Sequence, residues 1–330
     1  MQAPTSSSLA ASAPSAHTHS LSDSSALQLP ASGVARLEHL GVIEASGEDA
    51  IRFLNGQLSN DLNQLSPSLA RLAAFCSAKG RMQASFVAIK RDNGDVLLVC
   101  SADLLAPTLK RLSMFVMRAK AKLRDASADF AVYGLLGQST TALDAGAAAP
   151  WSAANTGDAS VVQLYPAQGL ARQLWIAPAN TPAPAGAALA LADWQSSEVL
   201  SGVATVGAAV AEAFVPQMLN FESVGGVSFK KGCYPGQEVV ARSQFRGTLK
   251  RRAFIVQGDA AMRAGQEVFS SADANQPCGL VAQAATDGDC HVAIAELQLS
   301  ATQGHSLHLG TAQGALLQLL PLPYSLRDDI

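Results

Sequence analysis

The stretch from Phe214 to Arg252 reads FVPQMLNFESVGGVSFKKGCYPGQEVVARSQFRGTLKRR, and it holds the densest group of reactive side chains in the protein. Within thirteen residues it places two lysines, a cysteine, a tyrosine, a glutamine, a glutamate and an arginine, whereas the rest is mostly Ala, Leu, Val, Ser and Gln. Pro235 is a favoured first residue of a helix, so Gln237 to Arg242 is expected to form the opening turns. This pattern places Cys233 just before a helix start.

Cys233 is therefore the first candidate functional residue. Unpaired N–H groups and the positive end of the dipole at a helix start favour a thiolate, and so does the charge of Lys230 and Lys231. The alternative is a small buried hydrophobic residue, which is the commoner fate of a lone cysteine. The surrounding charges favour the reactive interpretation.

The residues Lys231 to Arg242, KGCYPGQEVVAR, closely resemble the K-G-C-Y-x-G-Q-E signature of the YgfZ family. These are folate-binding proteins related to the glycine-cleavage T-protein (aminomethyltransferase) and implicated in iron–sulfur enzyme maintenance and tRNA modification. Residues 47–62 (GEDAIRFLNGQLSNDL) and 73–82 (AAFCSAKGRM) resemble the family as well. The resemblance, which extends over roughly Leu37 to Leu320, implies the α+β T-protein fold: two similar α+β units and a C-terminal β-barrel around a folate-sized central hole.

Composition excludes several classes of protein. A chain of 330 residues with 48% hydrophobic and 15% charged residues is expected to be globular and soluble, and its net charge of −3 argues against a nucleic-acid platform driven by bulk electrostatics. The five cysteines are widely spaced without a C-x-x-C pair, so no disulfide framework and no metal site is expected. Reduced thiols in a cytoplasmic protein fit best. The cysteines are Cys76, Cys100, Cys233, Cys278 and Cys290.

Three regions are expected along the chain. Residues 1–35 contain no Lys or Arg and are rich in Ala, Ser and Pro, which is typical of a disordered tail rather than a targeting signal. Residues 36–245 form the folate-binding α+β region, and residues 246–330 form the barrel. No segment approaches the roughly 20 apolar residues of a membrane span.

Hydrophobic patterning predicts the elements of the α+β region. Residues 46–49 resemble a capping box, and the cations near the end of the second helix suit its dipole. These cations indicate a solvated face; a direct tRNA contact is the open alternative. Asn60 and Asp61 are functional candidates, although turn residues that bond their own backbone fit at least as well. The expected strands are 36–45, 71–78, 82–90, 95–100 and 128–136, and the expected helices are 48–58 and 102–123.

The second half is predicted to be mostly strands. Residues 137–159 are expected to form a short helix and a surface loop, and residues 178–188 a further loop. Strands at 161–165 and 173–177 are expected to pair. The expected barrel strands are 252–257, 266–270, 279–284, 290–296, 307–309 and 315–319.

The resemblance also implies a folate pocket. Trp194 stands eight residues before Gly202, as does a tryptophan that lines the pocket in family members, and an indole face suits a flat pterin ring. The alternative is a core tryptophan. The residues assigned to binding of tetrahydrofolate or another reduced folate are Trp194, Leu40, Gln217, Asn220, Phe229, Lys230, Tyr234 and Gln237.

One position argues against T-protein chemistry. The aminomethyltransferase carries a catalytic Asp in the strand after its Gly-rich hairpin, and the resemblance places Gln83 there. Because a neutral amide cannot take up a proton as a carboxylate does, glycine-cleavage chemistry is not expected.

The predicted function is a folate-binding accessory protein, expected as a monomer, that supports iron–sulfur cluster assembly or repair in client enzymes, including tRNA-thiolating ones. Cys233 would be the functional thiol. Lys230 and Lys231 would hold its thiolate or attract the glutamate tail of the folate. Gln237 and Glu238 would orient the loop, with Arg242 pairing to Glu238. The alternative is a tetrahydrofolate-dependent one-carbon transferase or oxidase, in which Asp61 or Glu222 replaces the missing Asp. A purely structural scaffold ranks last, because it leaves the polarity of the central block unexplained.

Overall fold

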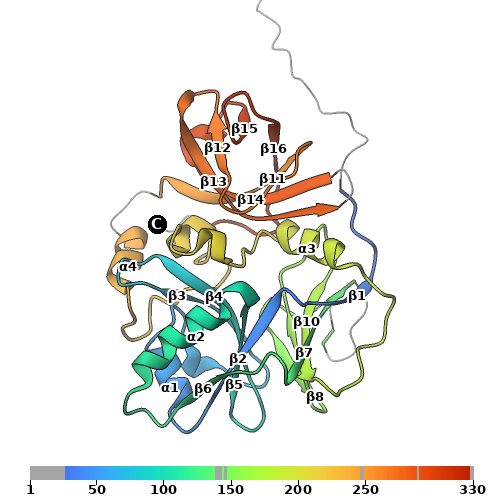
Figure 1. Cartoon of the computed structure of the whole chain (residues 1–330), viewed down its shortest axis with the longest axis vertical. Coiled ribbons are helices and arrows are strands. Elements are labelled where there is room, and N and C mark those ends of the chain that lie inside the picture. Colours follow the sequence, from blue (N-terminus) through green and yellow to red (C-terminus); the bar gives the residue numbers. More distant parts are fainter. Residues whose placement is uncertain (1–26, 138–142, 145–146, 246–248, 288–289, 328–330) are drawn as a thin grey trace, which may run out of the picture.

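The computed structural model describes residues 27–137, 143–144, 147–245, 249–287 and 290–327. Two five-stranded antiparallel sheets lie side by side, and a closed six-stranded barrel caps both of them (Figure 1). The predicted combination of α+β units with a C-terminal barrel is confirmed.

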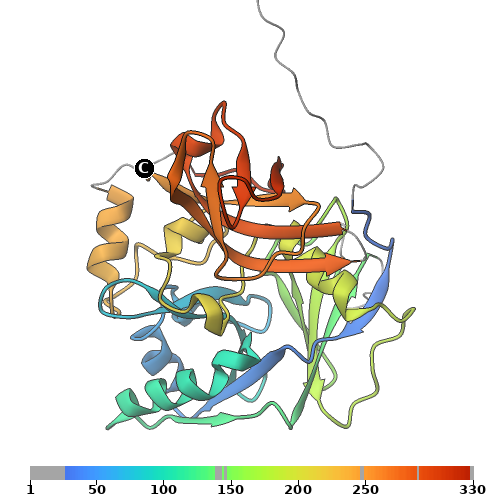
Figure 2. The ribbon, with the colours of Figure 1, turned by 45° about the horizontal axis from the view of Figure 1, so that its top comes forward.

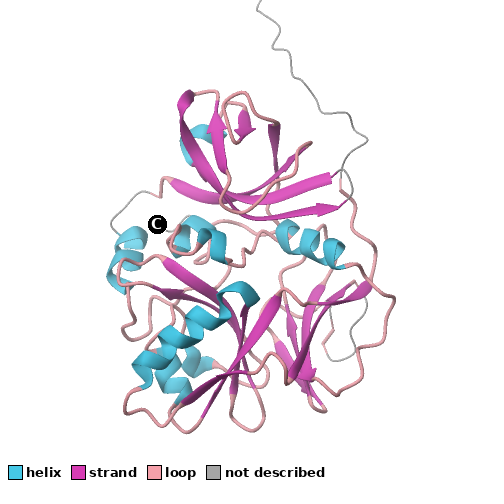
Figure 3. Ribbon diagram, viewed as in Figure 1, coloured by secondary structure: helices cyan, strands magenta, loops and turns pink. Residues whose placement is uncertain are grey.

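The first sheet carries the longer helices. Its strand order is β3-β4-β5-β2-β6, and α1 and α2 pack beside it (Figure 3). Helix α2 buries Leu104, Leu105, Thr108 and Leu112, which recur on one helical face. The bounds are β2 Leu40–Ser46, α1 Ala50–Asn55, β3 Arg71–Cys76, β4 Met82–Lys90, β5 Val96–Ser101, α2 Ala102–Val116 and β6 Lys122–Asp125, with a 3-10 turn at Leu62–Gln64.

The second sheet has the order β1-β7-β10-β9-β8. Helix α3 packs between this sheet and the barrel strands β13 and β14. The bounds are β1 Gly33–Arg36, β7 Phe130–Leu136, β8 Ala153–Thr156, β9 Ala159–Gln163, β10 Arg172–Pro178 and α3 Leu191–Leu200, followed by 3-10 turns at Ala208–Val210 and Pro216–Leu219 and by α4 at Gln237–Phe245.

Strand β11 of the barrel is buried on both of its faces. Along β11, Ala253 and Ile255 join the main core, whereas Val256 points into the barrel interior, as the two-residue period of a strand requires. Figure 2 shows these strands lying across α3, with α4 apart at the edge of the molecule. The bounds are β11 Arg251–Gly258, β12 Glu267–Ser270, β13 Asp273–Asp287, β14 Cys290–Gln298, β15 Leu307–Leu309 and β16 Leu316–Leu320, with a 3-10 turn at Leu299–Thr302.

The N-terminal expectations need correction. Residues 1–26 of the expected tail lie outside the described residues, but 27–35 are not a tail, because Leu27 is buried and β1 pairs with β7. The single strand expected at 36–45 is two strands in different sheets. The chain turns at residues 37–39, where the polar Glu38 and His39 interrupt the apolar pattern.

Both early helices are shorter than predicted. Helix α1 has six residues and no side-chain cap, because the Asp49 carboxylate instead accepts a hydrogen bond from the Lys120 amide at 2.9 Å. Helix α2 ends at Val116, because Met117 adopts a positive φ of 40°. Of the cations after it, Lys120 pairs with Glu48, and Arg124, which lies on β6, pairs with Glu44.

The described residues of the region 137–159 contain strand β8 and no helix. Part of the expected short helix falls on residues 138–142 and 145–146, which lie outside the described part of the chain. The expected pairing of the next two strands is confirmed, since β9 and β10 are antiparallel neighbours.

Candidate functional site

The three segments that resemble the YgfZ family meet around Lys231. Its Nζ atom donates to the carbonyl oxygens of Asn55 and Leu58, the latter at 2.6 Å, and lies 4.9 Å from the centre of the Tyr234 ring. Burial lowers the pKa of Lys231 to about 8, although the charges of Asp61 and Cys233 oppose that change. The ammonium group therefore fastens this loop to the end of α1, where carbonyl groups lack helical partners.

Two glycines bring the hairpin of residues 77–81 against the same loop. Gly236 has a φ of 81°, and a Cβ there would lie 2.4 Å from the Ser77 carbonyl oxygen and 2.7 Å from Gly80. Only glycine suits both the conformation and the close approach.

Cys233 is exposed on this loop, while its neighbour Tyr234 is buried. Helix α4 begins at Gln237, so Pro235 is not its first residue, because the positive φ of Gly236 cannot belong to a helix. Cys233 therefore lies further from the helix start than expected. The predicted pair of Glu238 with Arg242 is confirmed at 2.8 Å, between two exposed side chains.

Asp61 acts as a turn residue, whereas the Asn60 side chain joins segments that are distant in the sequence. The Asn60 amide donates to the carbonyl oxygens of Leu72 and Gly225, both at 2.7 Å. The Asp61 carboxylate accepts from the Asn63 amide at 3.2 Å and so caps the following 3-10 turn.

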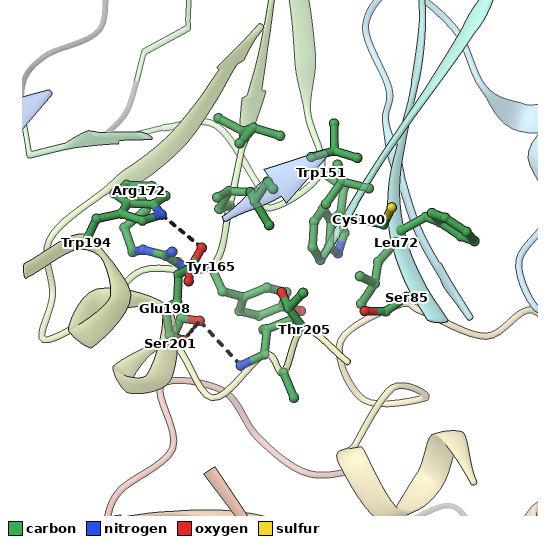
Figure 4. Close-up of a pocket in the computed structure, with 18 residues that line it drawn as sticks. Leu72, Ser85, Cys100, Trp151, Tyr165, Arg172, Trp194, Glu198, Ser201 and Thr205 are labelled. Carbon is green, nitrogen blue, oxygen red and sulfur yellow. Dashed lines mark hydrogen bonds between the residues drawn. The ribbon is translucent and has the colours of Figure 1, made fainter. Parts of the chain in front are cut away.

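A separate cavity lies between the two sheets and α3, with about 610 Å³ of space free of protein atoms, part of it open to solvent. Its walls are mostly apolar, and Tyr165 is a half-buried aromatic side chain within them. Figure 4 shows Arg172, Trp194 and Glu198 grouped at one end, with Trp151, Leu72 and Cys100 at the other. The lining residues are Leu40, Leu72, Ser85, Phe86, Val87, Val99, Cys100, Trp151, Leu164, Tyr165, Arg172, Leu174, Trp194, Glu198, Ser201, Val203, Ala204 and Thr205.

Trp194 contributes to the wall but offers no open face. Its side chain is 0% exposed, and it packs on Gly134, where a Cβ would lie only 2.4 Å from the indole. The Arg172 guanidinium lies 4.5 Å from the indole centre. Trp194 lines the cavity, but the core covers its indole in this structure, so the ring offers no free face for stacking, and its part in folate binding stays a prediction.

The polar end of the cavity is a network around Glu198. Its carboxylate accepts from the Trp194 indole at 2.9 Å and bonds His39 Nε2 at 3.1 Å. Burial lowers the pKa of His39, but the hydrogen bond and the charge of Glu198 outweigh burial, so the net pKa is raised. Burial lowers the pKa of Arg172 to about 10, and the charge of Glu198 opposes this change. The sequence analysis did not identify Arg172 as a site residue, although it is the charged residue of an otherwise uncharged strand.

Of the eight residues expected to bind folate, Trp194 and Leu40 line this cavity and the other six lie elsewhere. Gln217 is buried and donates to the Val240 carbonyl at 2.7 Å, and Asn220 donates to the Ala253 carbonyl at 2.9 Å, so both anchor neighbouring elements. Phe229 packs edge-on against Phe245. The other three, Lys230, Tyr234 and Gln237, belong to the loop and the start of α4.

Gln83 is also outside the cavity lining. It lies at a bulge of β4, and its side-chain amide donates to the Glu212 carboxylate. The cysteine that does line the cavity is Cys100, whose pKa is raised to about 12 by burial and by Asp125 and Asp103, which keeps it a neutral thiol.

Neither a metal centre nor a membrane span is found in the described residues. No group of three or more His, Cys, Asp or Glu side chains there is arranged to hold a metal ion. Among the same residues, no helix combines the length and the apolar character that crossing a bilayer demands.

Comparison with known proteins identifies the family. No protein-family model matches the chain. The tRNA-modifying protein YgfZ of Photobacterium profundum is 30% identical over 320 residues, which cover 91% of this chain and 94% of that protein. The protein of the same name from Colwellia psychrerythraea is 32% identical over 239 residues, which cover 69% of this chain and 72% of that protein.

A solved structure shows the same fold. The aminomethyltransferase T of the glycine cleavage system from Bartonella henselae superposes with a TM-score of 0.65, covering 89% of this chain and 86% of that one at 14% identity. This likeness confirms the predicted T-protein fold. With the relatives above, it leads to one conclusion: the chain belongs to the YgfZ family.

Proposed function

We propose that this protein is a folate-binding accessory protein that supports iron–sulfur enzymes, including those that modify tRNA, and that its ligand site and functional thiol are separate. One observation carries the proposal. Cys233 is exposed on its loop, whereas the cavity between the sheets is lined by no described residue beyond Thr205. Membership of a family of tRNA-modifying proteins supports the same role.

The cavity suits a flat, largely apolar ligand with a few polar groups. Leu40 and Tyr165 are half-buried and offer contact area to a ring, and the buried Arg172 and Glu198 supply polar contacts at one end. A reduced folate bound there would supply a carrier of one-carbon units. These residues would bind and orient it and exclude water.

The exposed thiol suits chemistry with a partner protein. Cys233 and Lys230 are both exposed, and Lys231 is fixed by two carbonyl groups, so the loop presents the sulfur on a supported backbone. A thiol in this position can meet a cluster or a cysteine of a client enzyme, which a buried thiol such as Cys76 cannot.

The structure favours this role over one-carbon transfer. Glu198 is the only carboxylate among the described lining residues, and it is already held by His39 and Trp194. Asp61 caps a turn, and Glu222 pairs with buried Arg252. None of these three carboxylates is placed to act as a general base in the cavity.

The role of the thiol is tested by complementation. A strain that lacks its own copy would receive the wild-type protein, Cys233→Ser or Cys290→Ser, the last as a matched cysteine control in the barrel. We expect the wild type and the control to restore thiolated tRNA and the activity of iron–sulfur enzymes, and Cys233→Ser to restore neither. Full restoration by Cys233→Ser would remove the thiol from the function.

The ligand is tested separately. Calorimetry would compare tetrahydrofolate binding to the wild type, to Tyr165→Ala and to Phe245→Ala, an exposed aromatic outside the cavity lining. We expect weaker binding only for Tyr165→Ala, because base–aromatic stacking contributes about 1–3 kcal/mol, or roughly 5- to 160-fold in affinity. Equal loss in both variants would place the ligand elsewhere.

A further inference from the structure

We propose that Arg172 is the residue that recognises the ligand in this cavity, by donating hydrogen bonds to the 4-oxo group of a 2-amino-4-oxopyrimidine ring such as that of a pterin. This inference rests on the proposed folate-binding function and deepens it. Sequence resemblance did not point to Arg172; its surroundings do.

The guanidinium group of Arg172 is buried with donors to spare. Its Nε atom donates to the Ser197 hydroxyl at 2.9 Å, and Nη1 donates to the Tyr165 carbonyl at 3.3 Å. Nη2 makes no hydrogen bond to any described residue. The side chain is 3% exposed, yet it lines the cavity, so the unused donors have access to a ligand but little access to bulk water.

The charge of Arg172 has the Trp194 indole beside it but lacks a carboxylate partner. Within the described residues no carboxylate lies within ion-pair distance of it, whereas the nearby Glu198 is 3.1 Å from His39. Buried charges are normally paired, because an unpaired one loses its hydration without compensation. An acceptor atom from a ligand would supply the missing contact.

The same surroundings select a neutral acceptor over a carboxylate. Glu198 shares the cavity end with Arg172, so a ligand carboxylate placed there would meet a like charge in a poorly solvated site. A ring carbonyl accepts from the guanidinium without that repulsion. The neighbouring N3–H group and the 2-amino group beyond it can donate to Glu198 at the same time. This pattern of one acceptor beside donors is the edge of a 2-amino-4-oxopyrimidine ring.

Pterins and guanine share this edge, so the source must be distinguished by experiment. Calorimetry on the full chain at about pH 8, without oxygen, would compare tetrahydrofolate with tetrahydroaminopterin, in which a 4-amino group replaces the 4-oxo group. Tetrahydropteroate, which lacks the glutamate, and guanosine would complete the set. We expect tetrahydrofolate to bind about tenfold or more tightly than the 4-amino analogue, because a donor would then face a donor. Tetrahydropteroate should bind nearly as well, and guanosine weakly or not at all.

Two variants connect this preference to Arg172. Arg172→Met keeps the length of the side chain and removes its donors, and Arg36→Met is the matched control, since Arg36 also lies over an aromatic ring, Tyr133, but outside this cavity. The preference for the 4-oxo ring should fall to near onefold only in Arg172→Met. Thermal unfolding would establish that both variants fold. Should Arg172→Met not fold, the proposal is still tested by Arg172→Lys and by the ratio of the wild-type affinities for tetrahydrofolate and tetrahydroaminopterin.

The possible failures have different meanings. Equal binding of the 4-oxo and 4-amino ligands would overturn the role of Arg172 while leaving folate binding intact. Loss of binding with tetrahydropteroate would show that recognition depends on the glutamate tail rather than on the ring edge and would equally overturn the proposal. Guanosine binding tighter than tetrahydrofolate would keep the recognised ring edge but contradict a pterin as its source. No binding of tetrahydrofolate by the wild type would reject the proposed function itself.

Discussion

Replacing Gly134 by alanine tests whether Trp194 is a fixed part of the core. Gly134 lies on β7, paired with Ala35 on one side and Leu174 on the other. A Cβ at this position would lie 2.4–2.5 Å from three atoms of the indole, far inside van der Waals contact. The ring cannot easily move away, because its N–H group bonds Glu198 at 2.9 Å. Gly134→Ala should therefore be destabilising.

The size of the effect follows from two opposing contributions. Overpacking a well-filled core costs about 1–3 kcal/mol, and replacing glycine where its φ is ordinary returns about 0.4–1 kcal/mol through the unfolded chain. We expect a net loss of about 1–2 kcal/mol in the free energy of unfolding, measured by urea titration with circular dichroism. Gly232→Ala is the control, because a Cβ there meets no atom within 4 Å.

A double variant identifies the cause. In the background Trp194→Leu the smaller side chain leaves room for the new methyl group, so the cost of Gly134→Ala should fall to less than about 0.5 kcal/mol, near the limit expected for independent sites. An unchanged cost in both backgrounds would show that the indole is not what opposes the methyl group. The absence of any cost would show that the indole is free to move, and stacking of a ligand on it would again be open.

Three further predictions concern buried or half-buried charges. Arg252→Met should lower the free energy of unfolding by about 3–5 kcal/mol, because it leaves the fully buried Glu222 carboxylate unpaired, and adding Glu222→Gln should recover part of the loss in urea titrations. Glu198 raises the pKa of His39, so the contribution of the His39–Glu198 pair to the free energy of unfolding is complete below about pH 6.5 and is lost as the pH rises through the raised pKa. This fall of stability with pH should be absent from His39→Gln when unfolding is measured across that range. Lys231 should give a pH dependence of the opposite sign. Because its pKa is lowered to about 8 in the folded protein, the unfolded chain binds more protons above that pH, and the stability of the wild type should rise between pH 8 and 10.5. Lys231→Met should not show this rise; parallel curves for the two proteins would argue against the buried ammonium group.

The barrel was the most predictable part of the fold. Short runs of alternating apolar and polar residues, broken by Gly, Asp and Asn, predicted every barrel strand, and the predicted and observed bounds of β15 are the same. The first helices were less predictable. Favourable residues continue past the end of α2, and only Met117, whose positive φ has no signal in the sequence, shows where that helix stops. Local patterning detects elements well, but tertiary contacts set their ends.

The candidate site was predicted in part. The motif around Cys233 was recognisable because its side chains are close together in sequence. The cavity is built instead from single residues on separate strands, and Arg172 and Tyr165 carry no local motif. Gln217 and Asn220 lie in the same stretch as the motif, yet they hold α4 and the barrel in place. Closeness in sequence therefore identified the loop but not the cavity.

The separation of the ligand site from the thiol is tested most directly by tetrahydrofolate calorimetry on the wild type and Cys233→Ala. The structure predicts saturable binding with the same affinity for both proteins, because Cys233 is exposed and does not line the cavity. Binding that disappears together with the thiol would contradict this arrangement and place Cys233 at the ligand.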